Sequence, residues 1–291
     1  MKINEITVET DSNIWDADFL DSGKYILSTE NGAFFVDGKR FEVDIRVKHR
    51  SRFRVRFITE NKFLIIDGWE DTEWQEVNAW IVNKNGKVEN TLSLGPLHKL
   101  IVIQDKIIVS YSDCRCGDDD YGKGMNFYNL EGELLYQYNK ENQLTNRWIM
   151  CNYGFLKKDE KSFYFMPYNF HDNGLRGNFI FVEYNIETQQ QKVLFCFYDC
   201  IPSVPTLDLK NYGPIAFSKK GLNWHIVAEK ENSKNYYIIE VDSSFNVSNI
   251  KELDQTLRSW RALMNGKFIA LCYQKQGEKN YDVKKIQIIE I

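Results

Sequence analysis

Two neighbouring stretches of the sequence combine clustered carboxylates with aromatic side chains. The stretch 67–76 reads DGWEDTEWQE and the stretch 113–124 reads DCRCGDDDYGKG. Carboxylates attract a basic protein surface, and aromatic rings then anchor it. Solvated charged loops that bind nothing would have the same composition, so both interpretations stay open. The residues predicted to bind a partner are Trp69, Asp71, Trp74, Glu76, Arg115, Asp118, Asp119, Asp120 and Tyr121.

Cys114 and Cys116 stand one residue apart in the second stretch, which raises the question of a metal site. Structural zinc takes four Cys or His ligands, and a Cys-x-x-Cys spacing would be the stronger signal. The sequence has no second pair of this kind. Asp118–Gly122 resembles the start of a calcium-binding loop, but the later carboxylates are missing. The histidines show no ligand spacing either: His49, His98, His171 and His225. We therefore expect no bound metal and no cofactor.

The elements that must carry these stretches are short strands. Runs such as KYILSTE, KFLIIDGW and KIIVSYS are rich in β-branched and aromatic residues, and turn signals such as Asn85-Gly86 separate them. The runs repeat with a loose period of about 45 residues, which is the spacing of propeller blades. FRVRFITENKFLII, for example, aligns with LHKLIVIQDKIIVS and with SWRALMNGKFIALC. The units begin near Trp15, Phe53, Leu97, Arg147, Tyr212 and Trp260.

These repeats predict an all-β fold, a six-bladed β-propeller formed by a single domain over residues 1–291. The last unit lacks a fourth strand and the chain begins with an unassigned strand, so residues 2–9 are expected to complete the last blade. That pairing would remove open sheet edges. An open meander or a β-sandwich is the alternative fold. A seventh blade would require a further strand pair within residues 196–215.

The stretch Gly95–Tyr138, with KIIVSYSD followed by GMNFYNLEGELLYQY, resembles uncharacterised bacterial β-propeller proteins. It has a strand ending in VSY, a glycine-rich loop and a hairpin around Gly132. The chain is also loosely similar to WD-repeat and NHL-type propellers, although no Trp-Asp dipeptide ends a blade. The resemblance implies the propeller fold, and a fold carries no activity with it.

Propeller connectivity places the long stretches on one face. In a blade, the loops from the second to the third strand share a face with the connections between blades, and the tight turns occupy the other face. The long loops here are 67–76, 113–124 and 168–178, whereas the tight turns are short and plain. Loops held by a rigid scaffold commonly carry binding sites. We therefore expect the face with the long loops to bind a partner.

The central channel supplies the alternative site. Arginine and tryptophan side chains at the start of the first strands could hold an anionic or planar ligand, or they could pack blade against blade. This site would make the protein an enzyme or a small-ligand sensor like the lactonase and lyase propellers. The chain contains no G-x-S-x-G elbow, P-loop or dinucleotide fingerprint. The residues of the channel site are Trp15, Arg147, Trp148, Trp260 and Arg261.

Composition narrows the choice of partner. The net charge of −4 lacks the basic balance that nucleic-acid binding favours. The first residues show no signal-peptide pattern and no apolar run is long enough for a membrane span, so we expect a cytoplasmic protein with free thiols. We predict a non-enzymatic, monomeric, protein-binding propeller that binds neither nucleic acid nor membrane. One version is an immunity or antitoxin-type protein that masks a basic partner.

Overall fold

The computed structural model describes residues 1–45, 52–67, 76–111, 124–142, 149, 151–168, 170–172, 175–177, 179–202, 208–231, 233, 235–253, 257–263, 265–276 and 280–291. Within these residues the strands form six sheets of four or five strands and one small hairpin. The chain divides into two compact units. We call residues 7–141 with 275–285 the N-terminal unit, and residues 1–6, 142–274 and 286–291 the C-terminal unit.

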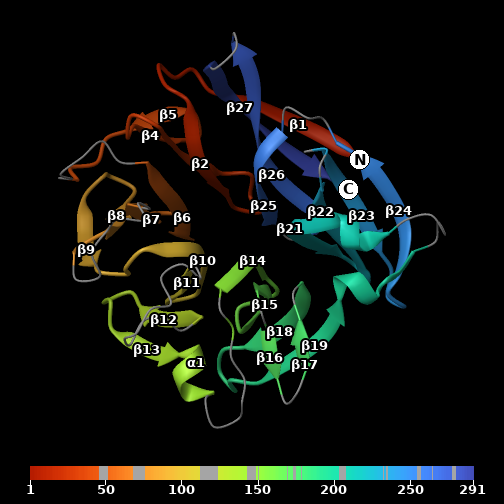
Figure 1. The fold of residues 1–291 in the computed structure, drawn as a ribbon. Coiled ribbons are helices and arrows are strands. Elements are labelled where there is room, and N and C mark those ends of the chain that lie inside the picture. Colours follow the sequence, from red (N-terminus) through yellow and green to blue (C-terminus); the bar gives the residue numbers. More distant parts are fainter. Residues whose placement is uncertain are drawn as a thin grey trace. The chain divides into compact units, whose positions relative to one another are not determined.

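The N-terminal unit contains blades 1 to 3, each a four-stranded antiparallel sheet (Figure 1). Blade 1 consists of β2 (Ile14–Phe19), β3 (Tyr25–Thr29), β4 (Phe34–Val36) and β5 (Lys39–Phe41). Blade 2 consists of β6 (Phe53–Thr59), β7 (Lys62–Asp67), β8 (Ala79–Asn83) and β9 (Val88–Leu92). Blade 3 consists of β10 (Leu97–Ile103), β11 (Lys106–Tyr111), β12 (Met125–Asn129) and β13 (Leu134–Gln137), and the short helix α1 (Tyr138–Glu141) follows it.

Blades 4 and 5 belong to the C-terminal unit. Blade 4 consists of β14 (Cys151–Lys157), β15 (Ser162–Tyr168), β18 (Ile180–Asn185) and β19 (Gln191–Cys196), with the hairpin β16 (Phe170–Asp172) and β17 (Leu175–Gly177) between its second and third strands. Blade 5 consists of β21 (Tyr212–Lys220), β22 (Asn223–Lys230), β23 (Tyr236–Val241) and β24 (Asn246–Glu252). The two-residue strand β20 (Ile201–Pro202) adds to β24 in parallel, between the 3-10 turns Phe197–Asp199 and Leu209–Asn211.

Blade 6 combines β25 (Leu257–Leu263), β26 (Lys267–Gln276) and β27 (Asn280–Glu290) with the first strand of the chain, β1 (Lys2–Thr7). The protein is therefore a six-bladed β-propeller, as the sequence repeats predict. The pairing of β1 with β27 confirms that the first residues complete the last blade. A seventh blade would need a further pair of strands within residues 196–215. Between β19 and β21, the described residues contain one two-residue strand, β20. That 1–291 forms a single domain stays a prediction.

The second strand of blade 2 is deeply buried on both faces. In β7, Phe63 and Ile65 pack towards blade 1, whereas Leu64 and Ile66 pack towards blade 3. All four side chains are at most 1 % exposed. A strand covered on both faces reads as a continuous apolar run rather than an alternating one. Apolar runs of this kind identify the repeats in the sequence. No helix among the described residues is long and apolar enough to cross a membrane.

Two aspartates of β2 fasten the first strand of blade 2. Asp16 Oδ2 accepts hydrogen bonds from the amide of Val55 at 2.9 Å and from Nη1 of Arg56 at 2.5 Å. Asp18 Oδ2 accepts from the amide of Phe57 at 2.8 Å. Because β6 is the first strand of its sheet, it has a neighbouring strand on one side only. The two carboxylates accept hydrogen bonds from backbone N–H groups that no strand of the sheet pairs. The first strands of blades 1 and 2 are thereby held in register, and with them the loops at their ends.

Candidate functional site: the loop-bearing end of blades 2 and 3

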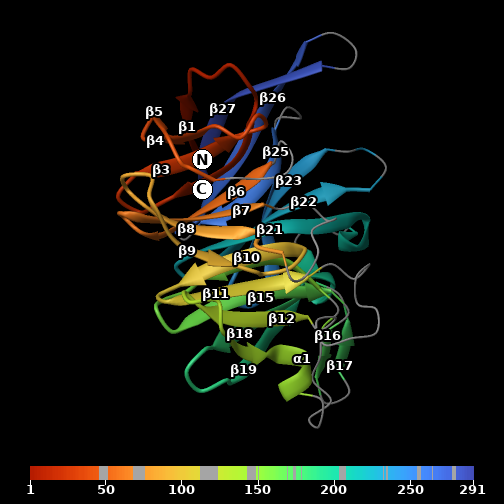
Figure 2. The ribbon, with the colours of Figure 1, turned by 90° about the vertical axis from the view of Figure 1, so that its left-hand side faces the viewer.

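The two acidic stretches connect the second and third strands of blades 2 and 3. Asp67 at the end of β7 pairs with Phe53 at the start of β6, and Tyr111 at the end of β11 pairs with Leu97 at the start of β10. Both stretches therefore leave the corresponding end of two neighbouring sheets (Figure 2). Glu76 is the predicted partner-binding residue that the structure describes, and it is half-buried. The others lie outside the described residues: Trp69, Asp71, Trp74, Arg115, Asp118, Asp119, Asp120 and Tyr121.

Asn78 ties the end of the first acidic stretch to the connection between the two blades. The residue is 1 % exposed. Its Nδ2 donates to the carbonyl oxygen of Gly95 at 2.7 Å, and its Oδ1 accepts from the amide of Leu94 at 2.7 Å. Its backbone carbonyl accepts from the amide of Asp67 at 2.8 Å. One buried residue thus holds the two ends of the stretch together and fixes them to the chain that leads into β10.

Tyr111 continues this network to the base of the second acidic stretch. Its hydroxyl donates to the carbonyl oxygen of Leu94 at 3.0 Å and lies 3.0 Å from the hydroxyl of Tyr128. Asn126 donates from Nδ2 to the Tyr128 hydroxyl at 3.3 Å. The amide of Tyr111 donates to the carbonyl oxygen of Gly124 at 3.4 Å, which closes the base of this stretch. Because Leu94 bonds to Asn78 as well, the bases of the two stretches share one network.

Buried hydrogen bonds resist opening, because an unpaired donor or acceptor would remain away from water. The side chains of Tyr111, Asn126 and Tyr128 are all buried. An apolar cluster between the blades, including Ile66 and Leu97, packs around the same network. The bases of the two stretches are therefore fixed relative to each other. We call this part of the molecule, with Asn78 and Tyr111 at its centre, the loop base.

Trp15 lies at the corresponding end of blade 1. The guanidinium of Arg52 lies 4.5 Å from the centre of its ring, and Nη2 of Arg52 lies 3.5 Å from the Glu30 carboxylate. Asn13 donates to the same carboxylate at 3.0 Å and accepts from the amide of Val283 at 2.8 Å. Arg52 is exposed and directly precedes β6. The cluster places an accessible cation–aromatic pair beside β6, whose neighbour β7 leads into the first acidic stretch.

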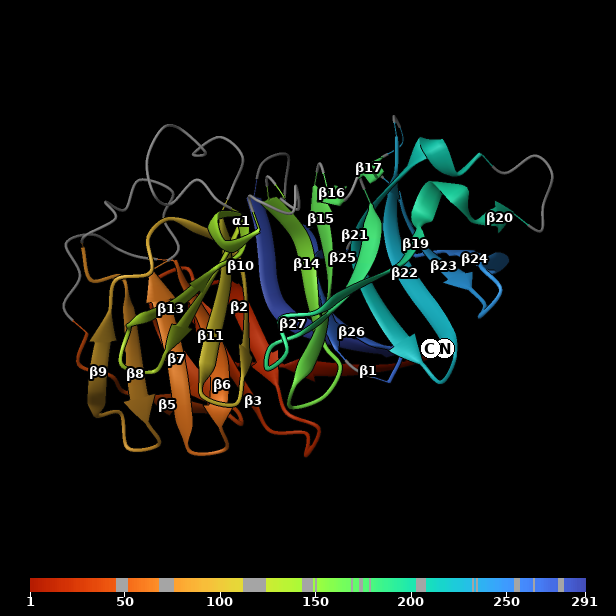
Figure 3. The same ribbon diagram turned by 90° about the horizontal axis from the view of Figure 1, so that it is seen from below.

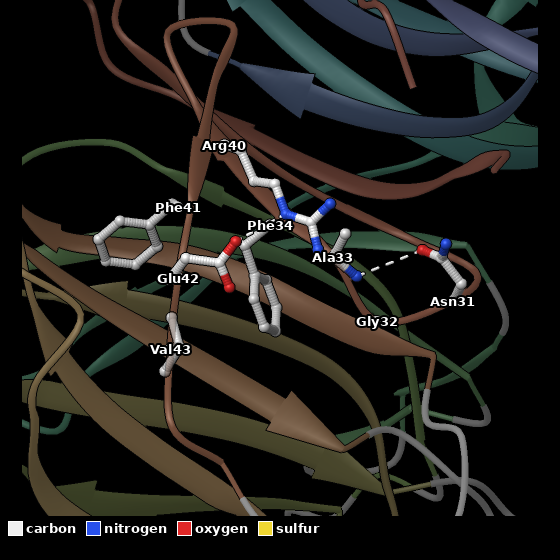
Figure 4. A pocket seen from close by; sticks show the side chains of 8 residues that line it. All are labelled: Asn31, Gly32, Ala33, Phe34, Arg40, Phe41, Glu42 and Val43. Carbon is white, nitrogen blue, oxygen red and sulfur yellow. Dashed lines mark hydrogen bonds and ion pairs between the residues drawn. The ribbon is translucent and has the colours of Figure 1, made fainter. Parts of the chain in front are cut away.

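A hollow of about 130 Å³ lies on blade 1 (Figure 4). Residues 31–34 of the turn into β4 and residues 40–43 at the end of β5 line it. Its two charged residues, Arg40 and Glu42, form an ion pair at 2.7 Å. The Oδ1 atom of Asn31 accepts from the Thr29 hydroxyl at 2.6 Å, and its Nδ2 donates to the Asp11 carboxylate at 3.3 Å. The two charges of the hollow are therefore paired with each other.

The residues predicted for the channel site are distributed over both units. Arg147 and Trp148 lie outside the described residues. In the C-terminal unit, Trp260 is 9 % exposed and its ring packs against Tyr236, which places it in the core of blades 5 and 6. Arg261, the next residue of β25, is half-buried. The channel site stays a prediction.

Three cysteines of the C-terminal unit, Cys196, Cys200 and Cys272, are free thiols. Burial raises the pKa of Cys200 to about 12 and also raises the pKa of Cys196. Both thiols are therefore protonated near neutral pH, and a protonated thiol is a poor nucleophile. Among the residues whose placement is described, no three His, Cys, Asp or Glu side chains gather as metal ligands would. Cys114 and Cys116 lie outside this part of the chain.

Sequence reasoning missed the residues of the loop base. Asn78 stands directly before the apolar run of β8, and Tyr111 stands at the end of the largely apolar strand β11. A polar residue at the edge of a buried run is a signal that could have marked each of them. Their mutual contacts could not be predicted, because they join residues that are distant in the sequence and meet only through strand pairing and through the connection between blades 2 and 3.

Comparison with known proteins shows the fold alone. No family model and no curated protein sequence matches the chain. Among solved structures, a member of the DUF4221 family from Bacteroides vulgatus is 10 % identical, with a TM-score of 0.55 over 99 % of this chain and 95 % of that one. The resemblance to uncharacterised propeller proteins is thereby confirmed at the level of the fold.

Two further solved structures have similar TM-scores, but they belong to two different kinds of protein. The β-propeller domain of Cps50 (Swd1) from Myceliophteria thermophila is 10 % identical, with a TM-score of 0.53 over 96 % of this chain and 84 % of that one. A putative oxidoreductase from Thermus thermophilus, described as a glucose dehydrogenase, is 10 % identical, with a TM-score of 0.52 over 99 % of this chain and 100 % of that one. Since one fold carries such different proteins, function must be argued from the site.

Proposed function

We propose that the protein is a non-enzymatic binding propeller that recognises a basic protein surface with the loop-bearing end of blades 2 and 3. The observation that carries this proposal is the loop base, in which Asn78 and Tyr111 share Leu94 as a hydrogen-bond partner. Bases that are already ordered reduce the conformational entropy that binding must overcome. The fixed bases also let two stretches from different blades act on the same partner.

The chemistry of the partner follows from the charge of the two stretches. The stretch 67–76 has five carboxylates and no lysine or arginine, and the stretch 113–124 has four carboxylates against two cations. A concentrated negative charge speeds the encounter with a positively charged protein. The three aromatic residues in the stretches, Trp69, Trp74 and Tyr121, are the residue types that anchor interfaces. A cytoplasmic protein that masks a basic toxin is the version of this function that we propose.

The test compares one loop variant with one matched control. The loop variant is Trp74→Ala with Asp118→Lys and Asp120→Lys. The control, Asp21→Lys with Glu131→Lys, makes the same two charge reversals at exposed positions in tight turns. Extracts of the native host are passed over both proteins and the wild type, and each captured protein is then purified and titrated by calorimetry.

We expect the wild type and the control to bind the same basic protein, with an affinity that falls as salt is added because exposed charges are screened. The loop variant should bind at least about tenfold more weakly, which corresponds to about 1.4 kcal/mol. Equal binding by the loop variant, or a partner with an acidic surface, would reject the proposal.

A further inference from the structure

A chain of buried hydrogen bonds leads from blade 3 to the connection between blades 2 and 3. The hydroxyl of Tyr111 donates its single hydrogen to the carbonyl oxygen of Leu94 at 3.0 Å. The hydroxyl of Tyr128, 3.0 Å away, is therefore the donor in the contact between the two tyrosines. Tyr128 in turn accepts from Nδ2 of Asn126 at 3.3 Å. The bonds thus run in one direction, from Asn126 through the two tyrosines to Leu94.

In this chain, the Tyr111 hydroxyl is the link between the bases of the two acidic stretches. Tyr111 is the last residue of β11, which leads into the second acidic stretch. Leu94 lies in the connection that leads into β10, the strand that pairs with β11 (Figure 3). The amide of Leu94 donates to Asn78, which closes the base of the first acidic stretch. Among the described residues, Tyr111 has the only side chain of blade 3 that bonds to Leu94.

One atom of this chain of bonds is left unpaired. Oδ1 of Asn126 is buried and has no hydrogen-bond partner among the described residues. A buried acceptor without a donor destabilises a fold, and this loss offsets part of what the hydrogen bonds contribute. Apolar side chains of similar shape would fill the same space without that loss, but they would not impose the directional contacts that exclude other arrangements. A positional role therefore accounts for a network that a gain in stability alone leaves unexplained.

A fixed spacing between the two bases affects how a partner with several positive groups binds. Each acidic stretch has an excess of carboxylates, so each can attract its own group of positive charges. Once one stretch has bound, the second contact is intramolecular. Its effective concentration is highest when the spacing of the partner's groups matches the spacing of the two sites. Fixed bases therefore favour one spacing in the partner, whereas loosened bases would bind more weakly over a wider range of spacings.

We propose that the Tyr111 hydroxyl is a positioning group, which makes the two acidic stretches one two-point site for a partner with two separate basic clusters. The inference rests on the function proposed above and adds to it the form of the partner. Tyr111 is 1 % exposed, so it does not contact the partner itself. It acts through Leu94, which joins the base at Tyr111 to the base at Asn78.

The test uses the full-length protein and synthetic peptides in which the spacing of positive charge is varied. A series of peptides carries two clusters of arginine, joined by flexible glycine–serine linkers of increasing length. A further peptide has serines in place of the second cluster. The affinity of each peptide is measured by fluorescence anisotropy at one salt concentration, because salt screens exposed charges. The linker length with the highest affinity reports the spacing of the two contacts.

Three protein variants separate positioning from stability. Tyr111→Phe removes the hydroxyl that bonds to Leu94. Tyr128→Phe removes a buried hydroxyl from the same chain of bonds but leaves that bond in place. Ser218→Ala is the matched control in the C-terminal unit, because the buried hydroxyl of Ser218 in blade 5 donates to the carbonyl oxygen of Leu263 in blade 6. The melting temperature of each variant is measured beside its affinities.

For the wild type, we expect one linker length to bind at least about tenfold more tightly than the one-cluster peptide, with lower affinity for shorter and longer linkers. Tyr111→Phe should reduce this gain to less than about threefold and leave the affinity for the one-cluster peptide unchanged. Tyr128→Phe and Ser218→Ala should keep the wild-type profile. An unchanged profile in Tyr111→Phe, or an equal loss in Ser218→Ala, would refute the positioning role. A wild-type affinity independent of linker length would refute the two-point site alone, whereas no binding of any peptide would refute the proposed function as well.

Discussion

Asn78 shows how one buried side chain can set the position of loops that it does not belong to. Its amide group pairs with Leu94 and Gly95, so an alanine at this position would leave a buried N–H and a buried carbonyl unpaired. Each such loss costs roughly 1–3 kcal/mol. We predict that Asn78→Ala lowers the free energy of unfolding by about 3 kcal/mol, measured by urea denaturation. Asn90→Ala is the control, because water can replace the bond from half-buried Asn90 to Leu130, so its loss should stay below about 1.5 kcal/mol. Equal losses would contradict the role given to Asn78.

His225 is the residue whose titration should affect stability. It is 3 % exposed, and burial lowers its pKa from 6.5; Glu240 opposes this shift and Lys220 adds to it. Below a pH of about 6.5 the unfolded chain binds a proton at this residue more readily than the folded protein does. The contribution of His225 is therefore fully present above that pH and is lost as the pH falls. We predict that the wild type loses more stability between pH 7.5 and 5.5 than His225→Asn does, in urea unfolding at both values. Identical losses would show that His225 is not held neutral by burial.

At the scale of elements, Gly86 controls how the turn of blade 2 meets the chain after blade 1. A Cβ atom at this position would lie 2.0 Å from the carbonyl oxygen of Glu42. Gly221 has a positive φ of 60° but nothing within 4 Å of a Cβ atom. We predict that Gly221→Ala costs about 1 kcal/mol from backbone strain alone, and that Gly86→Ala costs about 3 kcal/mol because the neighbouring backbone must also move. Differential scanning calorimetry of the two variants measures this difference. A smaller loss for Gly86→Ala would mean that the two segments separate easily.

Much of the element order could be predicted from the sequence, because apolar runs bounded by turn residues are a local signal. KFLIID and KIIVSY give β7 and β11, and both are buried as their composition predicts. β20 could not be predicted, since a two-residue strand containing Pro202 depends on β24 for its hydrogen bonds. The candidate site was predictable only as a pair of acidic stretches. Its base depends on contacts between blades, and no local pattern in the sequence encodes the pairing of Asn78 with residues that follow β9.

At the scale of the whole molecule, the last blade depends on strands from opposite ends of the chain. β1 supplies the outer strand beside β27, and the amide of Val8 donates to the carbonyl oxygen of Lys284 at 3.0 Å. Val8 is buried, although most side chains of β1 are exposed, so backbone pairing holds the strand more than packing does. Removal of residues 1–9 would leave the edge of β27 open to pairing with other chains. We predict that the truncated protein aggregates or melts at a lower temperature, measured by light scattering after size-exclusion chromatography and by calorimetry. A synthetic peptide of residues 1–9, added in excess, should restore the monomer, whereas a peptide with the same residues in scrambled order should not. A truncated protein that stays monomeric with an unchanged melting temperature would show that β1 is dispensable for the sixth blade.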